Sequence, residues 1–164
     1  TNTAGSFRIQ DGSKIVAAKR SRGSILVWTD TALHALNNIG PPFIFGLNQI
    51  GANCGAISAS CVADVNGVTF WMSQSAFYSF DGAIKKLDCT VQDFVFDDIN
   101  STANGQVSVA VNTDFNEVTW FYPIGSADSE ITNYVTYNYE AYLIFLAYHC
   151  MALASPAPMR CVGS

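Results

Sequence analysis

The chain has 164 residues, of which 49% are hydrophobic and only 13% are charged. Its formal net charge of −5 provides no domain-wide basic surface, so free nucleic-acid binding is disfavoured. A surface so poor in charge indicates that a partner covers part of it, or that Ser, Thr and Asn replace the usual Lys and Glu.

A strand that ends in Trp recurs three times along the chain. In the first two copies a short polar turn and an alternating strand follow, whereas the third copy matches only in its first strand. The spacings of 43 and 49 residues fit a repeat of about four strands, which is the period of a β-propeller blade. We therefore expect all three Trp residues to act alike, as packing anchors between successive sheets. They are Trp28 in the strand 24–29, Trp71 in 68–72 and Trp120 in 117–122.

The segments between these anchors predict further strands and turns. Residues 46–55 contain several Gly and Asn residues and are predicted to form a loop. Residues 56–65 are predicted to form a strand of small residues. The dipeptides Asn66-Gly67 and Asp81-Gly82 predict tight hairpins because both positions tolerate positive φ. Together with shorter segments, these patterns predict roughly ten strands.

The hydrophobic period changes over residues 90–100. Apolar residues recur there at helical spacing, which predicts a helix of about three turns with Thr90 as its N-cap. The sequence thus predicts an all-β, β-propeller-like fold of about three blades of antiparallel hairpins, with one short helix near residues 90–100. The apolar residues of that helix are Val91, Phe94, Val95 and Ile99, and Asp93, Asp97 and Asp98 face away from them.

Residues 1–140 are predicted to form one partial propeller-like domain, and residues 141–164 an atypical apolar tail. Within that tail the apolar run 141–154 has 14 residues, fewer than the roughly 20 that a membrane helix needs. Residues 1–12 lack the apolar core of a signal peptide. We expect no membrane association.

Cysteine usage predicts free thiols. The chain has five Cys residues, and none of them shows the two-residue gap of a zinc or redox motif. Free thiols, some buried as small hydrophobic side chains, fit assembly in a reducing cytoplasm. The five are Cys54, Cys61, Cys89, Cys150 and Cys161.

The two His residues do not predict a site. His34 lies in an alternating strand, where a partly exposed strand residue is favoured over a site residue. His149 and Cys150 are adjacent, but no further metal ligand lies at a reachable spacing.

The carboxylates offer two further arrangements. The three Asp residues of the predicted helix resemble a solvated face more than a pair for glycoside hydrolysis. Glu117 and Asp114 would lie at the mouth of a propeller and could form a sugar-binding or acidic site. We predict no catalytic, metal-binding or cofactor-binding residue, no cofactor and no enzymatic activity.

An ordered set of short segments resembles the tail-associated structural proteins of tailed bacteriophages of the podovirus type, over residues 15–140. The resemblance implies a propeller-like virion protein of the tail or nozzle below the portal, which acts in assembly and in closing the DNA channel. It also implies other tail or portal-region proteins as partners, a homo-oligomer, assembly in the host bacterial cytoplasm and no sequence-specific nucleic-acid binding. No catalytic residues come with it. The segments include Trp28-Thr29-Asp30-Thr31, Ile39-Gly40-Pro41-Pro42, Asn53-Cys54-Gly55, Phe70-Trp71-Met72, Phe80-Asp81-Gly82, Leu87-Asp88-Cys89-Thr90-Val91, Glu117-Val118-Thr119-Trp120-Phe121-Tyr122-Pro123 and Tyr134-Val135-Thr136-Tyr137-Asn138-Tyr139.

The sequence departs from this family pattern after Glu140, where a Trp, a Gly and an Arg-Thr-Ala segment are expected. A truncated or frameshifted version of a longer protein would explain the change, and a natural short relative is the alternative. Continuation of the pattern in another reading frame after Glu140 would distinguish them.

Two other functions stay open from the sequence. A propeller that binds glycans or a host surface would place Trp120, Tyr122 or Tyr134 on an exposed mouth, whereas burial of all three Trp residues would remove that platform. A hydrolase would need Glu117 and Asp114 in one pocket.

Overall fold

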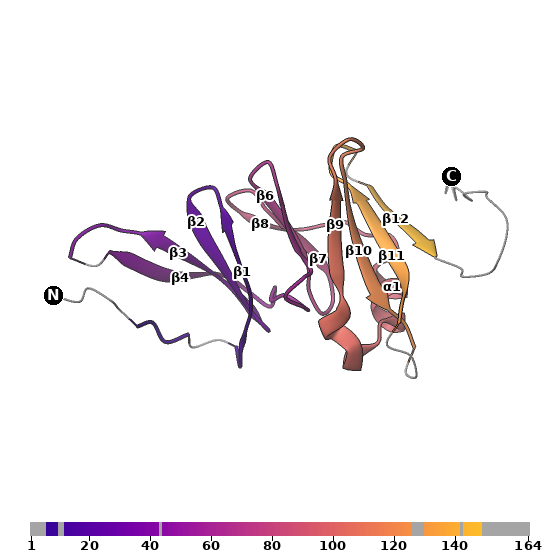
Figure 1. Ribbon diagram of the computed structural model, residues 1–164, viewed down its shortest axis with the longest axis horizontal. Coiled ribbons are helices and arrows are strands. Elements are labelled where there is room, and N and C mark those ends of the chain that lie inside the picture. Colours follow the sequence, from indigo (N-terminus) through magenta and orange to yellow (C-terminus); the bar gives the residue numbers. More distant parts are fainter. Residues whose placement is uncertain (1–5, 10–11, 43, 126–129, 142, 149–164) are drawn as a thin grey trace.

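A computed structural model of the chain describes residues 6–9, 12–42, 44–125, 130–141 and 143–148. Its described residues form three antiparallel sheets, a short α-helix and a 3-10 segment. Each sheet has four strands that follow one another in chain order. The predicted all-β class and the predicted four strands per repeat are therefore confirmed. The sheets lie in a row and do not close into a ring (Figure 1).

The last strand of the first sheet is longer than the sequence predicted, because only residues 43–45 were expected to be extended there. Residues 46–55 were expected to form a loop, yet β4 pairs with β3 along its length. The glycines of β4 lie in crowded surroundings: a Cβ on Gly51 would lie 2.2 Å from Ile84 Cδ1 and 2.6 Å from the sulfur of Cys54, and one on Gly46 would lie 3.2 Å from Ile39. Both glycines are therefore in a packed strand and not in a turn. The strands are β1 (Ile15–Ser21), β2 (Ser24–Thr29), β3 (Ala32–Asn38) and β4 (Phe45–Ala52).

The second sheet lies in the middle of the row. Its first strand is shorter than the predicted 56–65, because residues before it hydrogen-bond elsewhere: the N–H of Ile57 donates to Met72 O. The predicted Asn66-Gly67 hairpin is confirmed, with φ of 53° and 81°. The strands are β5 (Val62–Val65), β6 (Val68–Met72), β7 (Phe77–Phe80) and β8 (Ile84–Lys86).

The third sheet includes a strand beyond Glu140, the point at which the family pattern is lost. This strand, β12, pairs with β11 in regular antiparallel register. The 3-10 segment η1 (Ser101–Gln106) precedes the sheet. The remainder of the predicted tail, residues 149–164, lies outside the described residues. The strands are β9 (Ser108–Asn112), β10 (Glu117–Pro123), β11 (Ile131–Asn138) and β12 (Leu143–Tyr148).

The predicted helix exists but is shorter than three turns. The helix α1 (Gln92–Asp98) begins after Val91, which is its N-cap and provides no side-chain hydrogen bond. The prediction of Thr90 as N-cap was therefore wrong. Val95 is fully buried as expected, whereas Phe94 is 42% exposed. No helix in the described ranges is both long and apolar enough to cross a membrane.

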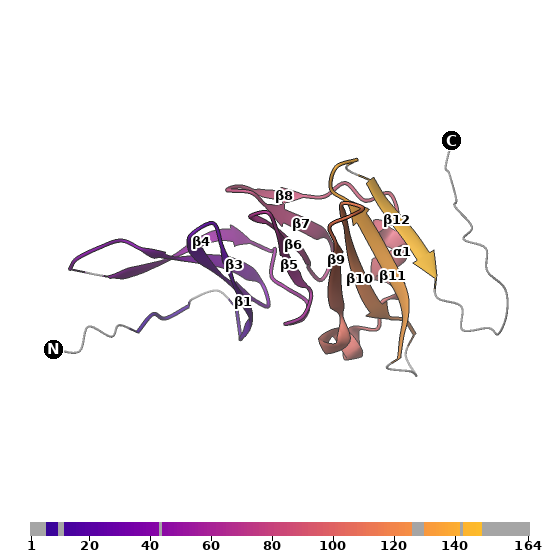
Figure 2. The ribbon, with the colours of Figure 1, turned by 45° about the horizontal axis from the view of Figure 1, so that its top comes forward.

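The sheets stack face to face, with their first strands β1, β5 and β9 next to one another (Figures 1 and 2). Polar contacts hold these strands together: Lys19 Nζ of β1 donates to Val62 O of β5 at 2.8 Å, and the N–H of Val109 in β9 donates to O of Ser60, just before β5, at 2.9 Å. A single hydrophobic core runs through both spaces between the sheets. Among the described residues, the middle sheet therefore packs against another sheet on both faces, and each end sheet on one.

Candidate functional site

The first interface, between the first and second sheets, is built around two indoles. The rings of Trp28 on β2 and Trp71 on β6 lie 5.5 Å apart in an edge-to-face arrangement. Trp71 also stacks on Tyr78 of β7 and donates its Nε1–H to Cys54 O at 2.8 Å. Trp28 Nε1 is buried without a hydrogen-bond partner in the described part of the chain.

The second interface uses different partners. Trp120 on β10 packs against Phe77 of β7, with ring centroids 4.9 Å apart, and donates its Nε1–H to Cys61 O at 2.9 Å. Phe70 of β6 packs against Tyr137 and Tyr139. The indole N–H groups of Trp71 and Trp120 therefore both donate to backbone carbonyls in residues 53–61, the linker between the first two sheets.

The expectation that the three Trp residues act alike is only half right. All three are fully buried between sheets, as expected. However, Trp28 and Trp71 contact each other from opposite sides of the first interface, so Trp28 points towards the following sheet and Trp71 towards the preceding one. Trp120 also points towards its preceding sheet. One step of a strand reverses the face of a side chain, so matching sequence positions do not ensure matching orientation.

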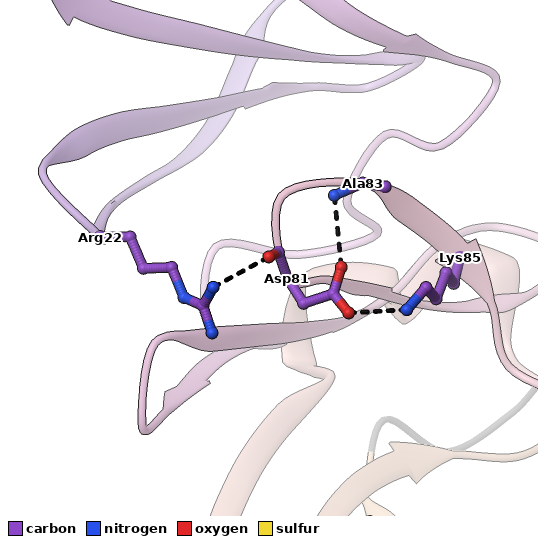
Figure 3. A network of polar contacts seen from close by, with 4 residues as sticks. All are labelled: Arg22, Asp81, Ala83 and Lys85. Atoms are coloured by element: carbon purple, nitrogen blue, oxygen red, sulfur yellow. Dashed lines mark hydrogen bonds and ion pairs between the residues drawn. The ribbon is translucent and has the colours of Figure 1, made fainter.

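Polar contacts join the first two sheets at their hairpin turns (Figure 3). Arg22, between β1 and β2, donates from Nη1 to Asp81 O at 3.0 Å. The carboxylate of Asp81 accepts hydrogen bonds from Lys85 Nζ at 2.6 Å and from the N–H of Ala83 at 3.3 Å. These contacts, led by the one with Lys85, lower the pKa of Asp81. The sequence pattern predicted the hairpin at Asp81 but not its contact with Arg22.

The N-terminal end face is the face of the first sheet that points away from the middle sheet. Trp28, Leu26, Leu33 and Ala35 lie on the covered face, so alternation places their strand neighbours on the end face. Register aligns Arg20, Ile25, Leu36 and Leu47 in one row across all four strands. Ile15, Ile25 and Phe45 are 61%, 40% and 49% exposed, and Val27, Leu36 and Leu47 are half-buried. These six apolar residues and Arg20 form its more accessible part, and the buried His34 lies on the same face.

The C-terminal end face is the corresponding outward face of the third sheet. It is more polar, and its cross-strand pairs include Thr119 with Thr136, whose hydroxyl oxygens lie 2.9 Å apart. Phe121 and Tyr134 form an aromatic pair with ring centroids 5.8 Å apart. Glu117 lies on this face beside the turn between β9 and β10. All five side chains are half-buried.

His34 is buried, contrary to the expectation of partial exposure. It is 5% exposed and lies on the N-terminal end face of β3, opposite Val27 and Gln49. Its Nδ1 atom is buried without a partner among the residues that the structure describes. Alternation along β3 places His34 on the face opposite Leu33 and Ala35. The close packing of that end of the sheet follows only from the fold: Gly12, for example, lies against Thr29.

The carboxylates considered from the sequence lie in two places, on α1 and around the turn between β9 and β10. Asp93, Asp97 and Asp98 are exposed on α1, as the helical spacing predicted. Asp114 is exposed in the turn before β10, and Glu117 is half-buried in that strand. Within the described residues, no cluster of three or more His, Cys, Asp or Glu side chains is arranged to hold a metal ion.

The described cysteines are free, as predicted. Cys54 and Cys61 are buried, and Cys89 is half-buried. Burial raises the pKa of each of these three thiols, which disfavours the reactive thiolate. Cys150, Cys161 and His149 lie outside the described residues.

The aromatic platform considered for glycan binding is largely buried. Trp120 and Tyr122 are fully buried, and Tyr134 is half-buried on the C-terminal end face. A shallow depression there is lined by Phe121, Ile131, Thr132, Asn133 and Tyr134.

The chain matches no protein-family model and no curated protein.

Proposed function

We propose that this protein is a structural component of a phage virion, in the tail or nozzle, and acts in assembly and DNA-channel closure. The observation that carries the proposal is the unequal covering of the three sheets. Both faces of the middle sheet pack against other sheets, whereas no sheet among the described residues packs on the outer face of either end sheet. Such a row of sheets is suited to packing against further β-structure.

A propeller-like architecture is part of the proposal. Propeller blades are four-stranded antiparallel sheets that follow one another around a central axis. Here each sheet is a four-stranded meander, and the first strands β1, β5 and β9 lie side by side. The resemblance of the sequence to podovirus tail proteins, which extends over residues 15–140, supports the same interpretation.

The proposal is tested by mass spectrometry of purified virions of the phage that encodes the chain. No Lys or Arg lies between Lys86 and Arg160, so trypsin gives poor coverage and a glutamyl endopeptidase is the suitable protease. Peptides present in stoichiometric amounts would support a virion component, and their absence from intact particles would contradict it. A peptide beginning at Ala141 would also show that the apolar tail is expressed in the particle.

Glycan or host-surface binding is the weaker proposal. Of its three aromatic residues, only Tyr134 retains an accessible side chain, next to Phe121. Loss of glycan-array binding in Tyr134→Ala, with retained binding in Phe115→Ala, would favour this function over assembly. Phe115 is a suitable control because it is 66% exposed in the turn between β9 and β10.

A further inference from the structure

We infer that the N-terminal end face of one copy packs against the C-terminal end face of a second copy, so that two copies form a head-to-tail ring of six sheets. The inference rests on the propeller-like arrangement proposed above and names a second copy of this chain as the partner. In this ring each copy packs through both of its end faces, so the same interface occurs twice.

The apolar content of the N-terminal end face is the first argument. Ile25, Leu36 and Leu47 lie side by side in one row, and Phe45 and Ile15 are about half exposed or more. Large apolar side chains gathered on one exposed face are typical of a surface that binds a partner. The C-terminal end face presents the rings of Phe121 and Tyr134, which provide apolar surface to cover this row.

The two internal interfaces indicate how unlike faces pair. In both, the face of one sheet that points towards the next sheet in the chain packs on the face of that next sheet which points back, with the first strands side by side. The C-terminal end face points onward in this sense, and the N-terminal end face points back. Contact between these unlike faces is heterologous, and heterologous contacts form closed rings when the rotation closes. Six sheets lie within the range of about four to eight blades in known propellers.

Charge complementarity fixes the orientation. Arg20 is exposed on the N-terminal end face, next to the turn that joins the first two strands of its sheet. Glu117 occupies the C-terminal end face, next to the corresponding turn between β9 and β10. In the first internal interface the corresponding turns are adjacent, because a Cβ on Gly67 would lie 2.9 Å from Nε of Arg22. The same stacking between copies would therefore bring Arg20 close to Glu117.

The test is a charge exchange in the full chain, measured by size-exclusion chromatography with light scattering at micromolar concentration and low salt. We expect the wild type to have twice the monomer mass of 17.7 kDa. Arg20→Glu and Glu117→Arg should each raise the dimer dissociation constant by about tenfold or more, because the pair occurs twice in the ring. The double variant should restore the dimer.

Matched controls reverse one positive and one negative charge elsewhere, on the middle sheet and on the segment after it. Lys86→Glu and Asp88→Arg alter exposed residues away from both end faces and should leave the dimer unchanged. Ile25→Asp places a charge within the apolar row and should give a folded monomer, with folding verified by circular dichroism.

A wild-type monomer would overturn the inference, as would a dimer that withstands Arg20→Glu, Glu117→Arg and Ile25→Asp. Failure of the double variant to restore the dimer would overturn the paired orientation. A chain that dimerises only after removal of residues 149–164 would show that its own tail covers an end face, which also overturns the inference. None of these results bears on the presence of the protein in virions, so the two proposals can fail separately.

Discussion

At the scale of single residues, the two indoles of the first interface differ by one hydrogen bond. Trp71 donates to Cys54 O, whereas Trp28 Nε1 has no partner among the described residues. Both Trp→Phe changes remove the same side-chain volume, but only Trp71→Phe removes a hydrogen bond that is present in the structure. Relative to the wild type, we expect the free energy of unfolding of Trp71→Phe, measured in urea, to fall by about 1–2 kcal/mol more than that of Trp28→Phe. Equal losses in the two variants would contradict this assignment.

A second residue-scale prediction concerns Asp30 and acid. Its carboxylate accepts hydrogen bonds from the hydroxyl and the N–H of Ser13, which lower the pKa of Asp30 below its ordinary value of about 3.9. A lowered folded-state pKa stabilises the fold above the ordinary value, and the effect is lost as pH falls through the folded-state pKa. Asp30→Asn should therefore be less stable than the wild type at neutral pH.

This difference should disappear in strong acid. Denaturant unfolding from neutral to acidic pH is the measurement, with Asp114→Asn as the control because Asp114 is exposed in a turn. A stability gap between Asp30→Asn and wild type that stays constant with pH would show that the hydrogen bonds to Ser13 do not act through ionisation.

At the scale of elements, the linker between the first two sheets is held by close backbone packing. A Cβ added to Gly55 would lie 2.4 Å from the carbonyl carbon of Asp30 and 2.5 Å from the nitrogen of Thr31. Both contacts are with the backbone of the β2–β3 turn, which cannot rotate away as a side chain can. Gly55→Ala should therefore lower the free energy of unfolding by about 1–3 kcal/mol through overpacking.

Gly105 supplies the matched control for this element. It lies in η1, and a Cβ there would meet no atom within 4 Å. We expect Gly105→Ala to leave the thermal unfolding midpoint nearly unchanged while Gly55→Ala lowers it. Similar midpoints for the two variants would show that the linker and the turn can separate at little cost.

At the scale of the whole molecule, the proposed ring couples stability to concentration. A partner that binds only the folded state raises apparent stability by mass action. The thermal midpoint of the wild type should therefore rise with protein concentration, and that of Ile25→Asp should not. Differential scanning calorimetry over a concentration series measures this. A wild-type midpoint independent of concentration would contradict association through the end faces.

Local pattern was sufficient for much of the fold. Alternation and turn chemistry determined the hairpin at Asn66-Gly67, where positive φ suits Asn and Gly, and the extent of β2 and β6. The spacing of the Trp residues determined four strands per repeat, because each buried indole belongs to the second strand of its sheet. These features depend on neighbours in the chain, which the sequence shows directly.

Only the tertiary structure decided the features that depend on distant neighbours. The Gly residues of β4 indicate a loop until the structure shows them packed closely against Ile39, Ile84 and Cys54. His34 is buried and Trp28 points opposite to Trp71, because sheet packing, and not local pattern, determines what covers each face. The outer faces of the two end sheets, on which no sheet packs among the described residues, follow from the same cause. A strand pattern shows which side chains share a face, but only the assembled sheets show which faces pack against another sheet.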